Sequence, residues 1–206
     1  MSRVKKATKD DNGKATRTIQ LPIDVNSILA LDLSLNATGY CRHRLDSGET
    51  DYGVIESNGK RGIERLDAIV GRVRGLLGEN PETGKPVCKL NTLVVIENYA
   101  FARANQAHQL GELHGVVRYE LWKLGFPYVL IAPMQNKKWI TGQGNSDKNL
   151  VLKELMKRYG FDVNDDNIAD AIGLMTLIKA VLGKWEHPLV AFQKEVVSKV
   201  LEATAS

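Results

Sequence analysis

Apolar residues follow two different spacings along this chain, and segments of the two kinds alternate. Short runs of apolar and β-branched residues indicate strands, whereas apolar residues that recur every three or four positions indicate helices. Strands are predicted at residues 27–34, 39–44, 51–55, 92–96 and 127–132. Helices are predicted at residues 63–77, 105–124, 146–159, 168–182 and 188–201, with Ser146 as the N-cap of the third.

The order of these elements predicts a single α/β domain whose mixed sheet of five strands is flanked by helices. Three strands joined by turns form an antiparallel meander, and the two later strands, reached through helical crossovers, pair in parallel. This domain occupies residues 25–185 of the 206. Residues 1–24 are predicted to be a disordered basic tail, and residues 186–206 a C-terminal amphipathic helix.

Charge and composition narrow the classes of function. The first 20 residues hold six basic and two acidic side chains, which accounts for the whole formal net charge of +4. A basic tail suits a polyanionic partner, although a solubilising leader has the same composition. We expect no membrane helix, because no sufficiently long apolar run exists. We expect a cytoplasmic protein, because the N-terminus lacks an apolar signal region and Cys41 and Cys88 have no CxxC spacing.

Two acidic residues stand inside or directly after predicted strands. Asp32 lies in the apolar run 27–34, where an uncompensated carboxylate is costly to bury unless a cation or a metal pairs with it. Glu97 follows the run 92–96, and ligand sites in open α/β sheets gather beyond the carboxyl ends of parallel strands. Alone, Asp32 is equally well explained as a strand-end acid that caps a turn, and Glu97 as a solvated acid at the end of a strand.

A third acidic signal stands at the start of the predicted helix 168–182. Asp166 and Asp170 are four residues apart and share a helix face, so their like charges are unfavourable unless a cation offsets them. Compensation of the helix dipole explains Asp165 and Asp166, but not Asp170, whose sequence neighbours are apolar. Carboxylates from two strands and this helix therefore predict a site for Mg²⁺ or Mn²⁺, the hard cations that oxygen-only ligands favour.

Four stretches resemble motifs of the RuvC-type Holliday junction resolvases, and they occur in the family's order. The motifs are Asp32 followed by Thr38-Gly39-Tyr40, the stretch VVIENYAFARANQAHQLGELHGVV with Glu97, Gly111 and Gly115, the residues Gly142, Gly144, Asp147 and Lys148, and NIADAIGL with Asp170. The resemblance covers residues 27–180 and points to the bacteriophage branch. It implies an RNase H-like fold and a homodimer that cuts four-way DNA junctions by paired symmetric nicks, leaving 5′-phosphate and 3′-hydroxyl ends.

The resemblance also assigns roles to the acids. Asp32 would bridge two Mg²⁺ ions, for which Mn²⁺ can substitute, Glu97 would support one ion, and Asp170 would support the other. Family members often carry an Asp or a His three residues before the last acid, and here that position is Asn167. Either Asp166 reaches the metal or Asn167 binds as a weaker, neutral ligand, and we predict Asp166.

Substrate contacts are predicted for basic and aromatic residues. Lys137, Lys138 and Lys148 flank a Gly-rich stretch, expected to be flexible, and suit phosphate contacts, and Lys148 also resembles a family lysine near the scissile phosphate. Tyr99 and Phe101 follow the second acid, where an aromatic ring can stack on an unpaired base. The alternatives are surface charge for the first two lysines and core packing for one ring. Phe101 is the ring expected to be exposed.

Two other functions stay open. A general branched-DNA or flap endonuclease of the same superfamily would share the metal site without two-fold symmetric cutting, and a non-catalytic junction-binding protein is supported by Asn167. No nucleotide cofactor is expected, because GENPETGK lacks the spacing of a phosphate-binding loop. Helix 105–124 resembles the family's dimer helix, and His114 on it is predicted to lie at the surface or in an interface. For a phage-encoded chain, the expected compartment is the host cytoplasm.

Overall fold

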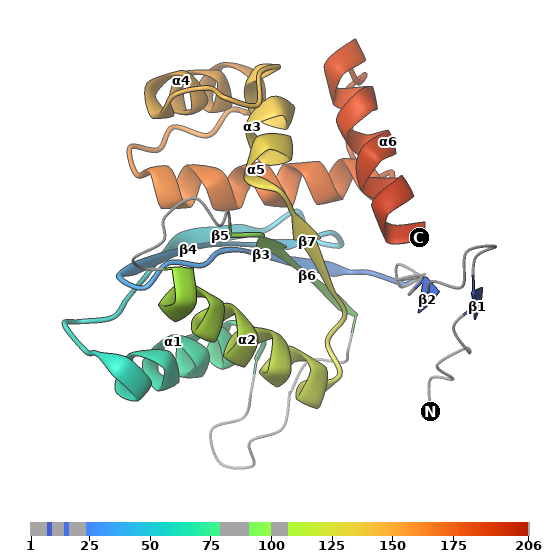
Figure 1. Ribbon diagram of the computed structural model, residues 1–206. Coiled ribbons are helices and arrows are strands. Elements are labelled where there is room, and N and C mark those ends of the chain that lie inside the picture. Colours follow the sequence, from blue (N-terminus) through green and yellow to red (C-terminus); the bar gives the residue numbers. More distant parts are fainter. Residues whose placement is uncertain (1–7, 10–14, 17–23, 79–90, 100–106, 206) are drawn as a thin grey trace.

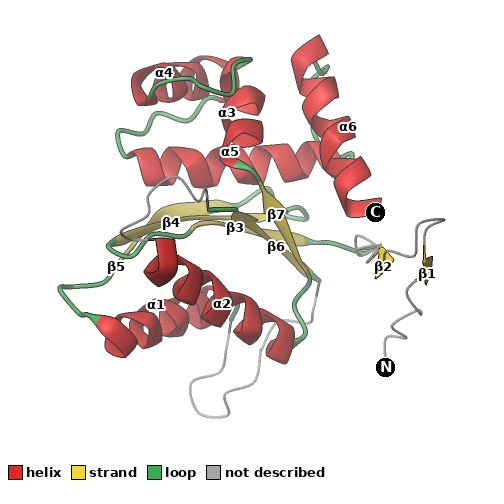
Figure 2. Cartoon of the chain, in the orientation of Figure 1, coloured by secondary structure: helices red, strands yellow, loops and turns green. Residues whose placement is uncertain are grey.

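A central sheet separates two layers of helices (Figure 1). The computed structural model describes residues 8–9, 15–16, 24–78, 91–99 and 107–205. Helices α1 (Gly62–Leu76) and α2 (Ala107–Leu124) cover one face of the sheet. On the other face (Figure 2), α5 (Asp166–Val181) packs on the sheet and contacts α3 (Pro133–Thr141), α4 (Lys148–Tyr159) and α6 (Ala191–Ala205).

The sheet has the five strands and the mixed pairing that the sequence predicts. The strands are β3 (Ser27–Asp32), β4 (Ala37–Arg44), β5 (Thr50–Glu56), β6 (Thr92–Glu97) and β7 (Tyr128–Ile131). Their order in space is β5-β4-β3-β6-β7. The first three form an antiparallel meander, and β6 and β7 join β3 in parallel. Both parts of the predicted topology are confirmed.

The two ends of the chain carry smaller elements. A second sheet pairs β1 (Thr8–Lys9) with β2 (Ala15–Thr16). Most of residues 1–24 lie outside the described ranges, so the disorder of the tail stays a prediction. The expected C-terminal helix is present as α6. None of the helices in the described ranges is long and apolar enough to cross a membrane.

The segment before the Gly-rich stretch forms a helix, α3, that the sequence pattern did not predict. Helix α3 begins at Pro133, and proline suits the first helical position because its missing N–H would have no partner in the helix. The Gln135 side chain accepts a hydrogen bond from the Ala132 N–H at 3.0 Å. Helix α3 therefore gives Lys137 and Lys138 fixed positions on a rigid element.

Helix α4 begins one residue later than predicted, with Asp147 and not Ser146 as its N-cap. The hydroxyl of Ser146 donates to the Gln143 carbonyl at 2.8 Å, and Ser146 is buried in the turn before the helix. The carboxylate of Asp147 instead accepts a hydrogen bond from the Leu150 N–H at 2.9 Å. The prediction of Ser146 as the cap is wrong, because the preceding turn uses the Ser146 hydroxyl.

Strand β3 is buried on both faces, and its side chains alternate between two cores. Ile28 and Ala30 pack in the core beneath α5, while the residues between them face α1 and α2. Strand β6 alternates in the same way, with Leu93 and Val95 on the α5 side. The acidic residue that ends each of these strands continues the alternation onto the α5 face.

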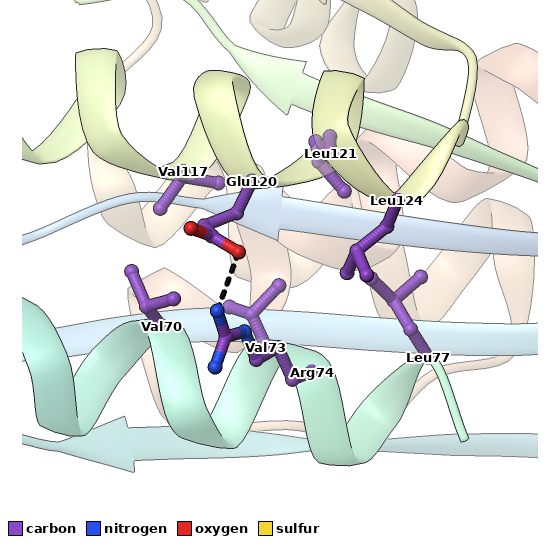
Figure 3. Close-up of a pocket in the computed structure, with 8 residues that line it drawn as sticks. All are labelled: Val70, Val73, Arg74, Leu77, Val117, Glu120, Leu121 and Leu124. Carbon is purple, nitrogen blue, oxygen red and sulfur yellow. Dashed lines mark hydrogen bonds and ion pairs between the residues drawn. The ribbon is translucent and has the colours of Figure 1, made fainter. Parts of the chain in front are cut away.

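The contact between α1 and α2 is apolar around one ion pair (Figure 3). Arg74 of α1 lies 2.5 Å from Glu120 of α2, measured from Nη2 to Oε2. Apolar side chains from both helices surround the pair: Val70, Val73, Leu77, Val117, Leu121 and Leu124. The hydrogen bond from Arg74 lowers the pKa of Glu120. The ion pair therefore favours the ionised carboxylate and stabilises the folded state.

Candidate active site

The ends of β3 and β6 place two carboxylates side by side on the α5 face of the sheet. The two strands run parallel, and Leu31 is the register partner of Ile96, so the residues that follow, Asp32 and Glu97, are neighbours. Alternation along each strand turns both side chains toward the core beneath α5. Two of the predicted site residues therefore meet at the carboxyl ends of adjacent parallel strands.

A glycine in β4 lets α5 approach this edge of the sheet closely. Gly39 is the register partner of Asp32, and a Cβ atom on Gly39 would lie 2.0 Å from the backbone oxygen of Asn167. Because no side chain fits there, the first turn of α5 rests directly on β4. Asp170 follows one turn later on α5. The glycine of the Thr38-Gly39-Tyr40 motif thus has a packing reason, since it lets α5 bring an acid to the strand ends.

The N-terminus of α5 is capped by the acid that precedes it. Asp165 accepts hydrogen bonds from the N–H groups of Asn167 and Ile168 at 2.9 and 3.1 Å. The side-chain nitrogen of Asn167 also donates to Asp165, at 3.2 Å, which ties that side chain to the cap. Asp166 forms an ion pair with Lys148 at the start of α4. The choice of Asp166 over Asn167 as a fourth metal ligand stays a prediction.

Burial and mutual repulsion raise the pKa values of three carboxyl groups at this edge. Burial, with added repulsion from Asp170, raises the pKa of Asp32 to about 7. Burial, followed by repulsion from Asp32 and Asp170, raises the pKa of Glu97 well above its ordinary value. Burial raises the pKa of Asp170 to about 6, against the attraction of Lys137. Acids perturbed in this way by desolvation and by specific charged neighbours are typical of functional sites.

The three acids are neighbours without being a preformed chelate. Among the described residues, no lysine or arginine forms an ion pair with Asp32, Glu97 or Asp170. Within the same ranges, no three His, Cys, Asp or Glu side chains converge closely enough to hold a metal ion as they lie. Their oxygen-only chemistry and their repulsion fit a hard divalent cation, whose binding would require the carboxylates to turn toward one another.

Two of the predicted lysines border the acids, and the third holds the C-terminal helix. Lys137 of α3 and Lys148 of α4 line a pocket together with Asp170. Lys138 forms an ion pair with Glu195 of α6 at 2.7 Å. The pocket next to the acids is therefore flanked by cations that suit a phosphate, whereas Lys138 fastens α6 to α3.

The predicted stacking residues are described only in part. Tyr99 is half-buried, and its ring centroid lies 4.8 Å from that of His114, while Phe101 lies outside the described residues. The surface or interface position predicted for His114 is wrong, because this residue is only 2% exposed within the single chain. Burial, with the charge of Arg118 nearby, lowers the pKa of His114 to about 4, so the ring is neutral at pH 7. His114 packs against the ring of Tyr99.

One residue of the site was missed by the sequence reasoning. Asn136 stands in a polar stretch that suggests exposure, yet its side chain is 0% exposed. Its Nδ2 atom donates to Glu97 Oε2 and to the backbone oxygen of Asp170, both at 3.0 Å. The available signal was helical spacing, because Asn136 shares the buried face of α3 with Trp139 and Ile140.

The sequence of this chain is similar to those of several known proteins that share one name. No protein-family model matches it. It is 29% identical over 150 residues to the crossover junction endodeoxyribonuclease RuvC of Gloeobacter violaceus, covering 71% of this chain and 78% of the relative. It is also 29% identical over 153 residues to the protein of the same name from a Synechococcus strain, covering 71% of this chain and 94% of the relative.

Solved structures show the same fold. The structure of Thermus thermophilus RuvC matches with a TM-score of 0.57 and 20% identity, covering 77% of this chain and 97% of that one. The T. thermophilus protein in complex with Holliday junction substrate matches with a TM-score of 0.58 and 19% identity, covering 77% and 96%. The chain therefore has the RNase H-like fold and is a homologue of the RuvC proteins, as its motifs predict. The bacteriophage branch stays a prediction.

Proposed function

We propose that this chain is a metal-dependent endodeoxyribonuclease that resolves four-way DNA junctions by paired, symmetric nicks. The observation that carries the proposal is the group of three half-buried, mutually repelling carboxylates, Asp32, Glu97 and Asp170, at one edge of an RNase H-like sheet. Similarity over 71% of the chain to proteins named crossover junction endodeoxyribonuclease supports this function. The fold neighbour solved with Holliday junction substrate supports branched DNA as the substrate.

The acids are the groups that would hold the metal. Asp32, Glu97 and Asp170 would bind two Mg²⁺ ions, or Mn²⁺ as a substitute, with Asp166 or Asn167 completing the set. When bound, such ions lower the pKa of the attacking water and stabilise the leaving oxygen. The buried strands beneath Asp32 and Glu97 hold their backbones in place, and Gly39 keeps α5 and its acid against them.

The basic and aromatic residues would position the DNA. Lys148 would offset negative charge on the scissile phosphate, after exchanging its ion pair with Asp166 for that phosphate. Lys137 borders the same pocket and would hold a neighbouring phosphate. A phosphate contact by Lys138 would likewise require it to leave Glu195. Tyr99 and Phe101 would stack on bases at the crossover.

Resolution of a junction requires two matched sites. A four-way junction has near two-fold symmetry, so paired nicks that leave 5′-phosphate and 3′-hydroxyl ends need a two-fold symmetric homodimer. Helix α2 is the proposed dimer helix, and its exposed aromatic residues Tyr119 and Trp122, 57% and 71% exposed, support this role. The proposed setting is the cytoplasm, which is that of the host for a phage-encoded enzyme.

Cleavage of a synthetic, immobile four-way junction in Mg²⁺ tests the proposal. Linear duplex, flap and fork substrates accompany it, and each is treated with wild-type protein and with the Asp32→Asn variant. We expect paired nicks at symmetric positions that DNA ligase reseals, and their loss in the variant. Preference for flaps or forks would instead make the chain a general branched-DNA endonuclease.

A junction-binding protein without activity is the second candidate. It is favoured by Asn167, which stands where the resemblance to the family leads one to expect an acid or a histidine, and whose side chain is tied to Asp165. Tight junction binding without cutting in either Mg²⁺ or Mn²⁺ would select this function over the nuclease.

A further inference from the structure

We infer that Asn136 is a positioning residue that ties the Glu97 carboxylate to the α5 backbone at Asp170 and so keeps these two acids next to each other for metal binding. This inference rests on the proposed function, because it concerns the same acids. It adds a residue from α3 whose side chain is not a ligand in the predicted metal site.

Both hydrogen bonds of Asn136 run toward the acids. Its Nδ2 atom lies 3.0 Å from Glu97 Oε2 and 3.0 Å from the backbone oxygen of Asp170. The second partner is a carbonyl and can only accept, so the side-chain nitrogen must face it and the amide orientation is fixed. A single NH₂ group thus joins the end of β6 to the helix that carries the third acid.

The rest of the side chain is enclosed and points away from the acids. Asn136 is 0% exposed, and no group in the described part of the chain donates to its Oδ1 atom. That atom faces Gly173 of α5, where an added Cβ would lie 2.5 Å from it and 2.4 Å from Cδ1 of Ile140. The oxygen therefore does not serve as a ligand, and Gly173 leaves the room that Asn136 needs against α5.

An unsatisfied buried oxygen is unfavourable for stability, which argues against a purely structural role. A buried polar atom without a partner loses its hydration and gains nothing in return. The interface between α3 and α5 has a second hydrogen bond, from Trp139 Nε1 to Thr176 Oγ1 at 2.9 Å, in which both partners are buried. That bond makes no contact with the acids, so it provides a matched comparison for Asn136.

The position of a carboxylate that binds a metal depends on the groups that hydrogen-bond to it. Loss of such an outer partner typically weakens metal affinity by about 10–100-fold. In Asn136→Ala, Glu97 would lose its one side-chain hydrogen bond within the described residues and α5 its link to α3 at Asp170. We expect Mn²⁺ affinity to fall about tenfold or more, and half-saturation of junction cleavage to require correspondingly more Mg²⁺.

The experiment compares wild type, Asn136→Ala, the similarly shaped Asn136→Leu and the control Thr176→Val. Mn²⁺ binding is titrated by electron paramagnetic resonance of the free ion. Cleavage of the four-way junction is measured against Mg²⁺ concentration, and junction affinity is measured in Ca²⁺. We expect both Asn136 variants to bind Mn²⁺ more weakly at unchanged junction affinity, and Thr176→Val to bind Mn²⁺ as the wild type does. Asn136→Ala leaves a cavity, whereas Asn136→Leu fills that space with a side chain of similar shape. Because the two substitutions disturb the packing in different ways, we expect at least one of the two variants to fold normally.

The outcomes separate this inference from the proposed function. Unchanged Mn²⁺ binding in the Asn136 variants, or equal weakening in Thr176→Val, overturns the positioning role even if the wild type resolves junctions. Weaker Mn²⁺ binding in the Asn136 variants alone supports the role even if the wild type cuts no junction. A wild type that binds no Mn²⁺ overturns both.

Discussion

The two faces of the sheet use half-buried charge in opposite ways. On the face covered by α1 and α2, Glu120 is paired with Arg74 among apolar side chains, and the pairing lowers its pKa. On the face covered by α5, Asp32 and Glu97 lie half-buried beside each other, and their pKa values are raised. The same strands supply alternate side chains to both faces.

This difference separates stability from function within one small domain. The α1–α2 face is built as an ordinary core, beside which the half-buried Glu120 is paired with the cation of Arg74. The α5 face retains carboxylates whose charges disfavour the folded state until something positive reaches them. We expect substitutions on the α1–α2 face to lower stability without changing activity. Neutral substitutions of the acids on the α5 face should instead abolish activity and raise the stability of the metal-free protein.

Removal of one charge from the α5 face is expected to have the largest effect. In Asp32→Asn, the central carboxylate of the proposed metal site becomes a neutral amide, so single-turnover cleavage of a four-way junction in Mg²⁺ should fall by about 10³-fold or more. Asp51→Asn is the control, because Asp51 lies on β5 of the same sheet and pairs with Arg42 at 3.5 Å. A cleavage rate of Asp32→Asn within tenfold of the wild-type rate would mean that Asp32 has no essential role in the reaction.

A cavity in the core beneath α1 and α2 should have the opposite effect, which is a loss of stability without a loss of cleavage activity. Ile69 of α1 is 0% exposed, and Ile69→Ala should lower the free energy of unfolding by about 3 kcal/mol in urea denaturation. Cleavage per folded molecule should change less than twofold. Ile63→Ala on the same helix, where the side chain is 76% exposed, should change stability by less than about 0.5 kcal/mol. Selective loss of cleavage in folded Ile69→Ala would mean that the two faces are not independent.

The pH dependence of stability sharpens the comparison. The folded-state pKa of Asp32 is about 7, above the ordinary 3.8, so the folded state binds more protons than the unfolded state between these values. Asp32 therefore lowers the stability of the metal-free protein as pH rises through this window. Asp32→Asn lacks this loss, so its stability advantage over wild type should widen by about 2 kcal/mol between pH 5 and pH 8.

The difference between variant and wild type is the quantity to measure. Burial lowers the pKa of His114 to about 4, which makes both proteins more stable as pH rises, and this contribution cancels in the difference. Saturating Mg²⁺ should erase or reverse the advantage at pH 8, because only the wild type gains from a cation between the acids. A constant difference across the pH range would mean that Asp32 is not destabilising in the folded state.

The sequence predicted the acids but not what supports them. Asp32, Glu97 and Asp170 interrupt or end apolar runs, and a charge in an apolar pattern is visible without a structure. Asn136 sits among polar residues of a helix that carries Pro133 and precedes glycines, so its burial became visible only once α3 was found to pack against α5. His114 was missed for a related reason, since it is buried on α2 together with Leu113 and Val117 and packs against Tyr99.

The smallest predicted effect concerns the ion pair of the α1–α2 face. Glu120→Gln removes the charge that Arg74 pairs with, and we expect the free energy of unfolding at pH 7 to fall by about 0.5–1 kcal/mol, since both side chains keep some solvent contact. The pKa of Glu120 is lowered in the folded state, so its contribution is present above the ordinary 4.5 and is lost as pH falls below it. The destabilisation measured in urea should therefore shrink as pH falls below 4.5, and junction cleavage should be unchanged. Neutralising a carboxylate would then destabilise one face of the sheet and stabilise the other, and a stabilising Glu120→Gln would contradict the division of roles between the two faces.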